Sequence, residues 1–245
     1  MAERMTHELR AWTMEPHFTR SAHGSVLVRA GKTMVLCTVS AVAGVPPHRI
    51  GKGGWLTAEY AMLPGSTRPR AGREGLSAKS KGRSREIERL IGRSLRAAVD
   101  LEALGELTLH VDTDVLDADG GTRTAAINGA FVALVLALGR LEEEGRLARW
   151  PLLRQITAVS CAWCDGAVVV DPDYAVDVRA DVDLNVVMAG EDQLIEVQGT
   201  AEQGVMPRAA LDAMVAAALS TRGALVALQR DAAGLLAARL PQGVA

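Results

Sequence analysis

The chain has few cysteines, few aromatic residues and no large excess of either charge. Three cysteines among 245 residues are too few for the disulfide framework of a small secreted domain. A formal net charge of −2 excludes a polycationic protein, so a nucleic-acid site would have to be a local basic patch. Hydrophobic residues make up 49% of the chain, which is enough for a buried core and argues against intrinsic disorder.

Long apolar runs and metal-binding motifs are also lacking. No run of about 18 uninterrupted apolar residues is present, and the N-terminal segment MAERMTHELRAW has no apolar centre. We therefore expect neither a membrane span nor a secretory signal, and a cytoplasmic location is the simplest expectation. Cys161 and Cys164 form a CxxC, but no second pair of ligands stands at matching spacing, so a zinc or redox centre is not expected.

The hydrophobic periodicities predict an α+β fold with helices packed on mixed sheets. The predicted elements, in order, are a hairpin over 25–42, a strand over 55–63, a helix capped by Ser84, a strand over 107–112, a helix over 123–144, hairpins turning at Asp165-Gly166 and at 190–192, and a helical tract over 207–240. We expect the helix over 123–144 to be buried, and the last tract to break at 220–223.

The segment Asp114 to Phe131, DVLDADGGTRTAAINGAF, joins a strand to the buried helix through two glycines. Gly120 and Gly121 can adopt backbone conformations that other residues avoid, and Thr122 is a plausible N-cap. A helix N-terminus attracts anions, and the guanidinium of Arg123 matches two phosphate oxygens at once. The segment is therefore a candidate phosphate site. The alternative is a structural strand-to-helix turn with Arg123 merely exposed.

A long basic segment, about 64–85, separates the strand over 55–63 from the first helix. It carries seven basic residues against the single acid Glu74: Arg68, Arg70, Arg73, Lys79, Lys81, Arg83 and Arg85. Long loops in compact domains are often functional, and this one has the charge to hold a phosphate backbone. The alternative is a solvated, flexible loop.

Five aspartates gather in DPDYAVDVRADVDLN: Asp171, Asp173, Asp177, Asp181 and Asp183. If a strand starts at Val182, then Asp181 and Asp183 share a face. Converging carboxylates can hold Mg²⁺, and they can raise one another's pKa until one serves as a general acid. An acidic surface turn is the alternative. A phosphate seat, a basic track and an acidic cluster are together what phosphorolysis of a nucleic acid requires.

Several long blocks resemble the bacterial ribonuclease PH family, among them GRSREIERLIGRSLRAAVDLEALGE, DVLDADGGTRTAAINGAFVAL, and DVDLNVVMAG followed by IEVQGTAE. The resemblance covers about residues 4 to 220. It implies a single ribonuclease PH domain over 1–245, with a left-handed βαβα core like that of the ribosomal protein S5 domain 2. It also implies a homohexamer, a trimer of dimers, that uses inorganic phosphate and Mg²⁺ to trim the 3′ ends of tRNA precursors and other RNA, releasing nucleoside diphosphates.

The resemblance also implies roles for particular residues. The family's phosphate site falls on Arg83, Gly121, Thr122 and Arg123, and its catalytic and metal-binding aspartate pair falls on Asp177 and Asp183. The family's RNA-binding loop falls on a third group: Arg68, Arg70 and Arg73.

The sequence departs from the family pattern in two places. Only Arg4 stands in for the end of the usual RxDGR block, and MLPGST replaces MLPRAT. Two alternative functions remain at this point: an inactive RNA-binding ring subunit, and a phosphate-independent hydrolase.

Overall fold

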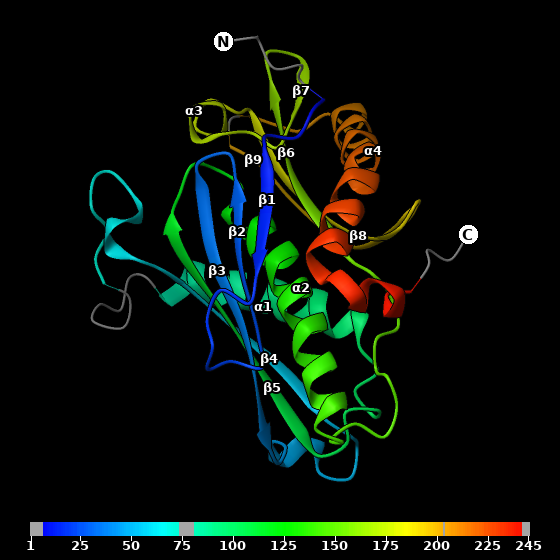
Figure 1. Cartoon of the computed structure of the whole chain (residues 1–245). Helices are drawn as coiled ribbons and strands as arrows, with labels where there is room; N and C mark the ends of the chain where they lie inside the picture. Colours follow the sequence, from blue (N-terminus) through cyan, green and yellow to red (C-terminus); the bar gives the residue numbers. More distant parts are fainter. Residues whose placement is uncertain (1–6, 74–80, 203, 242–245) are drawn as a thin grey trace.

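The computed structural model describes residues 7–73, 81–202 and 204–241, which form two β-sheets and four α-helices (Figure 1). The first sheet has five strands in the order β1 (Trp12–Pro16), β2 (Gly24–Ala30), β3 (Thr33–Ala43), β5 (Leu107–Asp117) and β4 (Trp55–Met62). Its neighbouring strands are antiparallel except for the parallel pair of β4 and β5. The second sheet is antiparallel throughout, in the order β7 (Ala167–Val170), β6 (Thr157–Cys164), β8 (Val182–Gly190) and β9 (Gln193–Ala201).

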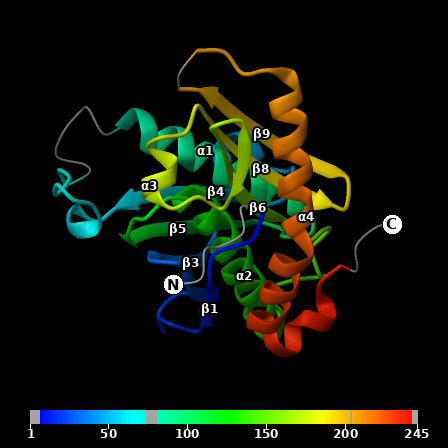
Figure 2. The same cartoon turned by 90° about the horizontal axis from the view of Figure 1, so that it is seen from above.

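Helices lie between the two sheets and also cover the outer face of the second sheet. The helical elements are α1 (Lys81–Ala98), α2 (Thr122–Glu143), α3 (Tyr174–Asp177) and α4 (Arg208–Ala233), with 3₁₀ turns η1 (Pro47–Arg49), η2 (Pro64–Ser66) and η3 (Gly234–Arg239). Helix α2 contacts β2 and β3 on one side and β6 on the other, while α4 packs on β6, β7 and β8 (Figure 2). The layers are therefore sheet, helices, sheet and helix.

Strand alternation divides the interior into two cores. In β6, Ala158 belongs to the core around α2, whereas Val159 and Cys161 belong to the core under α4. In β8, Leu184 and Val186 likewise face α4, so the residues between them face α2. Strands β6 and β8 are thus covered on both faces, and the polar residues Ser160 and Asn185 on the α2 face are buried between two layers.

Two helical segments are long and apolar enough to span a membrane by length and composition. In α2 the apolar window is 94% buried, because this helix is the centre of the larger core. In the segment Arg208–Arg239 the corresponding window is 28% buried.

Most predicted elements are confirmed: the first hairpin, the strand that becomes β4, the buried helix, and the turn at Asp165-Gly166. The predicted break at 220–223 is wrong, because α4 is continuous. Ser220 and Thr221 bond through their hydroxyls to carbonyls three residues earlier, which keeps both residues within the helix. The short edge strand β1 was not predicted.

The basic segment 64–85 differs from the prediction at both ends. Its first residues form η2, and α1 begins at Lys81, so Ser84 lies inside the helix and is buried there instead of capping it. Glu74 and Lys79 lie outside the described residues, as does Arg4.

Candidate active site

The glycine turn before α2 forms the floor of the candidate site. Gly120 and Gly121 have φ angles of 77° and 64°, in the left-handed region that favours glycine. Gly121 is the N-cap, so the prediction that Thr122 caps the helix is wrong: Thr122 is the first helical residue. The Thr122 hydroxyl instead lies 2.9 Å from the hydroxyl of Tyr60 on β4. The turn therefore directs the N-terminus of α2 and the side chain of Arg123 toward the same space.

A buried ion pair holds this turn. Arg10 Nη2 lies 2.7 Å from Asp171 Oδ1, and the two side chains are 8% and 0% exposed. The same guanidinium donates to the carbonyls of Asp119 and Gly120, and Thr33 Oγ1 donates to the Gly120 carbonyl at 2.7 Å. The segments that carry Arg10 and Thr33 thus fix the peptide orientations of the turn, and Asp171 holds Arg10 in place. Sequence reasoning missed Arg10 and Thr33 because neither lies in the motif.

The turn also fits closely under the segment that leads to α3. A Cβ placed on Gly120 would lie 2.5 Å from the carbonyl oxygen of Pro172, so no larger residue fits without movement. The backbone N–H of Tyr174 donates to Asp119 Oδ1 at 3.4 Å. This contact brings α3, which ends at Asp177, beside the N-terminus of α2.

Arg123 faces Asp183 across the candidate site. Arg123 Nη1 lies 3.8 Å from Asp183 Oδ2, and the two side chains are 19% and 27% exposed. Arg123 Nε is buried and has no hydrogen-bond partner among the residues that the structure describes. An unsatisfied buried donor is costly, so this guanidinium has capacity for an anion such as phosphate.

Two carboxylates at the site have raised pKa values. Burial, and next the charge of Asp177, raise the pKa of Asp183 to about 6, against the opposing effect of Arg123. Burial also raises the pKa of Asp177, while the charges of Arg83 and Arg123 lower it. Glu202 raises the pKa of both groups. A carboxyl group with a pKa near 6 can carry a proton close to neutral pH, as a general acid must.

The predicted site residues therefore come together in part. Arg83, at the exposed start of α1, is near enough to Asp177 to influence its pKa, and Arg123 influences both aspartates. Asp171 does not belong to the carboxylate cluster, because it is buried in the pair with Arg10. Asp181 precedes β8, and its charge, second to burial, raises the pKa of Cys164. Glu202 takes a place in the cluster that the sequence reasoning did not assign.

The arginine loop after β4 is tied to the glycine turn. Arg68, Arg70 and Arg73 are all exposed, on the segment that follows η2. The backbone N–H of Ala118 donates to the carbonyl of Ser66 at 3.0 Å, which anchors this segment two residues before Gly120. The three arginines thus extend from a point next to the candidate phosphate site.

The CxxC does not converge on one point. Cys161 and Cys164 lie in β6 three residues apart, so their side chains project from opposite faces of the strand. Cys161 is buried under α4, where burial raises the pKa of its thiol to about 12.

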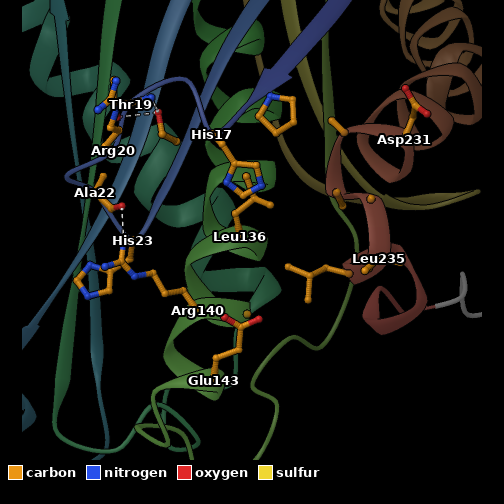
Figure 3. A pocket seen from close by; sticks show the side chains of 17 residues that line it. His17, Thr19, Arg20, Ala22, His23, Leu136, Arg140, Glu143, Asp231 and Leu235 are labelled. Carbon is orange, nitrogen blue, oxygen red and sulfur yellow. Dashed lines mark hydrogen bonds between the residues drawn. The ribbon is translucent and has the colours of Figure 1, made fainter.

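A hollow of about 610 Å³ lies near the other end of α2, away from the candidate site (Figure 3). Its charged and imidazole side chains are His17, Arg20, His23, Arg140, Glu143 and Asp231. The two arginines of this lining are balanced by two acidic residues, and Arg140 is already paired with Glu144 at 3.0 Å. The net charge of the hollow therefore favours neither anionic nor cationic ligands. None of the predicted site residues lines this hollow.

Two family models match the chain. The model "3′ exoribonuclease family, domain 1" matches residues 8–138, and "3′ exoribonuclease family, domain 2" matches residues 155–221. The chain belongs to the 3′ exoribonuclease family. The domain 1 match ends within α2, and the domain 2 match covers the second sheet and the first half of α4.

A curated relative supports the same assignment. A protein named Ribonuclease PH, from Thermosynechococcus vestitus, is 54% identical over 228 residues, which are 93% of each chain. The prediction of a phosphate-dependent 3′→5′ exoribonuclease is thereby confirmed at the level of the family.

Solved structures show the same fold at lower identity. Rice (Oryza sativa) Rrp46 is 21% identical with a TM-score of 0.77, covering 94% of this chain and 98% of its own. An Archaeoglobus fulgidus exosome chain, from a structure with RNA bound to the active site, is 22% identical with a TM-score of 0.78, covering 91% and 89%. The predicted α+β fold with mixed sheets is confirmed.

Proposed function

We propose that this chain uses inorganic phosphate to cleave the terminal phosphodiester at the 3′ end of an RNA, with the residues around α2 as its active site. The phosphate lies on Arg83, Gly121, Thr122 and Arg123. One observation carries this proposal: Arg123, with an unpartnered buried Nε at a helix N-terminus, faces a carboxyl group whose pKa is raised to about 6. Anion binding and proton transfer are thereby available within one site.

The chemistry follows from these two groups. A phosphate oxygen attacks the phosphorus of the last phosphodiester, the bond from phosphorus to the 3′ oxygen of the preceding nucleotide breaks, and a nucleoside diphosphate leaves. Asp183, assisted by Asp177, gives a proton to the departing 3′ oxygen. The guanidinium groups of Arg83 and Arg123 stabilise the negative charge that develops on the transferred phosphoryl group.

Mg²⁺ fits the donor set as an ion held jointly with the substrate. Asp177 and Asp183 offer the hard oxygen ligands that Mg²⁺ prefers, and the pKa of Asp183 is raised by burial and next by the charge of Asp177, a repulsion that a bound cation would relieve. Within the ranges that the structure describes, no group of three or more His, Cys, Asp or Glu side chains could hold a metal. We therefore propose that Asp177 and Asp183 bind Mg²⁺ with water and phosphate oxygens as further ligands, and that the ion supplies electrostatic stabilisation.

The exposed arginines indicate the path of the RNA. Arg68, Arg70 and Arg73 follow the anchor between Ser66 and Ala118, so a strand whose 3′ end is at Asp183 can pass over them. We propose precursor tRNA 3′ ends as the substrate class, a homohexamer built as a trimer of dimers as the assembly, and the cytoplasm as the location.

The test uses a tRNA with a short 3′ extension and Mg²⁺, with and without inorganic phosphate. We expect shortening only with phosphate, and loss of turnover in the double variant Asp177→Asn/Asp183→Asn. Asp212→Asn, on the exposed face of α4, is the matched control and should retain full activity. Shortening without phosphate would indicate a hydrolase, and RNA binding without shortening would indicate an inactive subunit. Either result would overturn the proposal.

A further inference from the structure

A chain of hydrogen bonds joins Asp183 to the first turn of α2. Asn185 Nδ2 donates to Asp183 Oδ2 at 3.3 Å, and Ser160 Oγ donates to Asn185 Oδ1 at 2.8 Å. Ser160 Oγ lies 3.2 Å from Thr124 Oγ1, so the Thr124 hydroxyl, whose other acceptor is the Gly121 carbonyl at 3.1 Å, can donate its one hydrogen to Ser160 Oγ. Thr124, Ser160 and Asn185 are 0%, 3% and 4% exposed, so water does not compete for the bonds among these three, while the bond from Asn185 to Asp183 is partly buried.

The register of the second sheet creates this chain. Ser160 on β6 and Asn185 on β8 are direct partners across the antiparallel pair, so their side chains lie on the same face. Asp183 is two residues before Asn185 and shares that face, which is the one that packs on α2. The neighbouring residues Ala158 and Val187 on this face are apolar and belong to the core around α2. On β6 and β8, the polar residues Ser160, Asp183 and Asn185 thus lie toward the end of this face that meets the helix N-terminus.

The donor and acceptor roles in these hydrogen bonds determine the orientation of the Asn185 amide. A carbonyl oxygen carries no hydrogen, so the Ser160 hydroxyl must donate to Asn185 Oδ1. This donation fixes the orientation of the amide and directs its N–H group at the Asp183 carboxylate. If the amide were reversed, its oxygen would face Asp183 Oδ2, and an ionised carboxylate would then meet a second acceptor. The Ser160 hydroxyl therefore determines how Asn185 contacts Asp183.

We propose that Ser160 and Asn185 are positioning residues that hold the Asp183 carboxylate opposite Arg123, with Thr124 in the first turn of α2 holding the far end of the bond chain. This inference depends on the proposed function, in which Asp183 meets the departing 3′ oxygen and the turn holds phosphate. Neither Ser160 nor Asn185 touches the substrate. Their loss displaces the acid while leaving the phosphate seat intact, so it lowers kcat and leaves the KM for phosphate unchanged.

The test compares Ser160→Ala with Thr157→Val, a matched change in the same strand. Thr157 is 0% exposed, and its hydroxyl has no hydrogen-bond partner within the described part of the chain, so Thr157→Val removes a buried hydroxyl without breaking a bond. We expect Ser160→Ala to lower kcat by about 10-fold, the scale of one buried hydrogen bond, with the KM for phosphate within about twofold of the wild type. Thr157→Val should retain the wild-type kcat.

Asn185→Asp provides a second, isosteric variant that does not depend on how well Ser160→Ala folds. Its carboxylate still accepts from Ser160, but it presents oxygen instead of N–H to Asp183, so kcat should fall at least as far as in Ser160→Ala. A wild-type kcat in Asn185→Asp, or equal values in Ser160→Ala and Thr157→Val, would overturn the positioning role. Absence of phosphorolysis in the wild type would instead overturn the proposed function, and the two failures are therefore distinguishable.

Discussion

Arg123 Nη1 and Asp183 Oδ2 lie 3.8 Å apart, which is too far for a hydrogen bond although the two groups carry opposite charges. The guanidinium therefore lowers the pKa of Asp183 without using its hydrogen-bond donors on the carboxylate. Both groups lie at the N-terminus of α2, and both can still form hydrogen bonds to a ligand. This arrangement suits a site in which an anion lies between an arginine and an acid.

Replacing Arg123 by Lys should weaken phosphate binding. Lysine keeps the charge but loses the planar pair of donors that matches two phosphate oxygens. We expect the KM for phosphate to rise by about 10- to 100-fold, equivalent to ~1.4–2.7 kcal/mol, in steady-state phosphorolysis. Arg140→Lys, in the last turn of the same helix, should leave the KM for phosphate unchanged. An unchanged KM in Arg123→Lys would exclude Arg123 from the phosphate site.

Asp183 should lower the stability of the folded protein near neutral pH. Folding raises the pKa of Asp183 to about 6. Its contribution to the free energy of unfolding is therefore fully present below the unfolded pKa near 4, and it is lost as the pH rises through 6. Above that range, holding the charge costs about 2–3 kcal/mol. Asp183→Asn should therefore unfold at higher urea concentration than the wild type at pH 8, without phosphate or Mg²⁺, and match it at pH 4. Lower stability of Asp183→Asn at pH 8 would contradict this pKa.

Gly120→Ala should destabilise the turn. A methyl group there would lie 2.5 Å from a carbonyl oxygen, and the residue has a φ of 77°. The steric clash and the backbone strain would therefore both destabilise the variant. We expect a loss of about 2–4 kcal/mol in the free energy of unfolding. Gly223→Ala is the control, because an added Cβ in α4 meets nothing within 4 Å. It should raise stability by up to about 1 kcal/mol. Equal effects of the two substitutions would show that the turn tolerates a side chain.

Breaking the Arg10–Asp171 pair should be costly because both side chains are buried. Arg10→Met leaves the Asp171 charge without its guanidinium, and we expect a loss of about 3–5 kcal/mol in equilibrium unfolding. The exposed pair of Arg208 and Asp212, with side chains 90% and 66% exposed, offers a comparison in which Arg208→Met should cost under about 0.5 kcal/mol. Similar losses in the two variants would mean that the pair does not stabilise the turn.

The sequence predicts the local features of this fold well and the long-range ones poorly. The Asp165-Gly166 turn and the buried helix were predictable because their signals are dipeptides or short periodicities. The continuity of α4 through Gly223 was not, because it depends on side-chain hydroxyls bonding within the helix. Strand β1 has five residues and one partner, so its pattern is too short to identify.

The candidate site likewise contains residues that the sequence identifies and residues that it does not. Arg123 and Asp183 were predictable from motifs, since each lies next to a glycine turn or in an acidic run. Arg10 could not be assigned, because its role depends on meeting Asp171 from 161 residues away. Ser160 and Asn185 likewise gain their roles from strand register, which a single sequence does not specify.

Whether phosphate itself attacks the RNA can be decided by following the phosphorus atom. The protein is incubated with Mg²⁺, an RNA bearing a 3′ extension and inorganic phosphate labelled with ³²P, and the released nucleotides are separated. We expect nucleoside diphosphates that carry the label in the β-phosphate. Unlabelled nucleoside monophosphates would contradict it, because water would then be the attacking group.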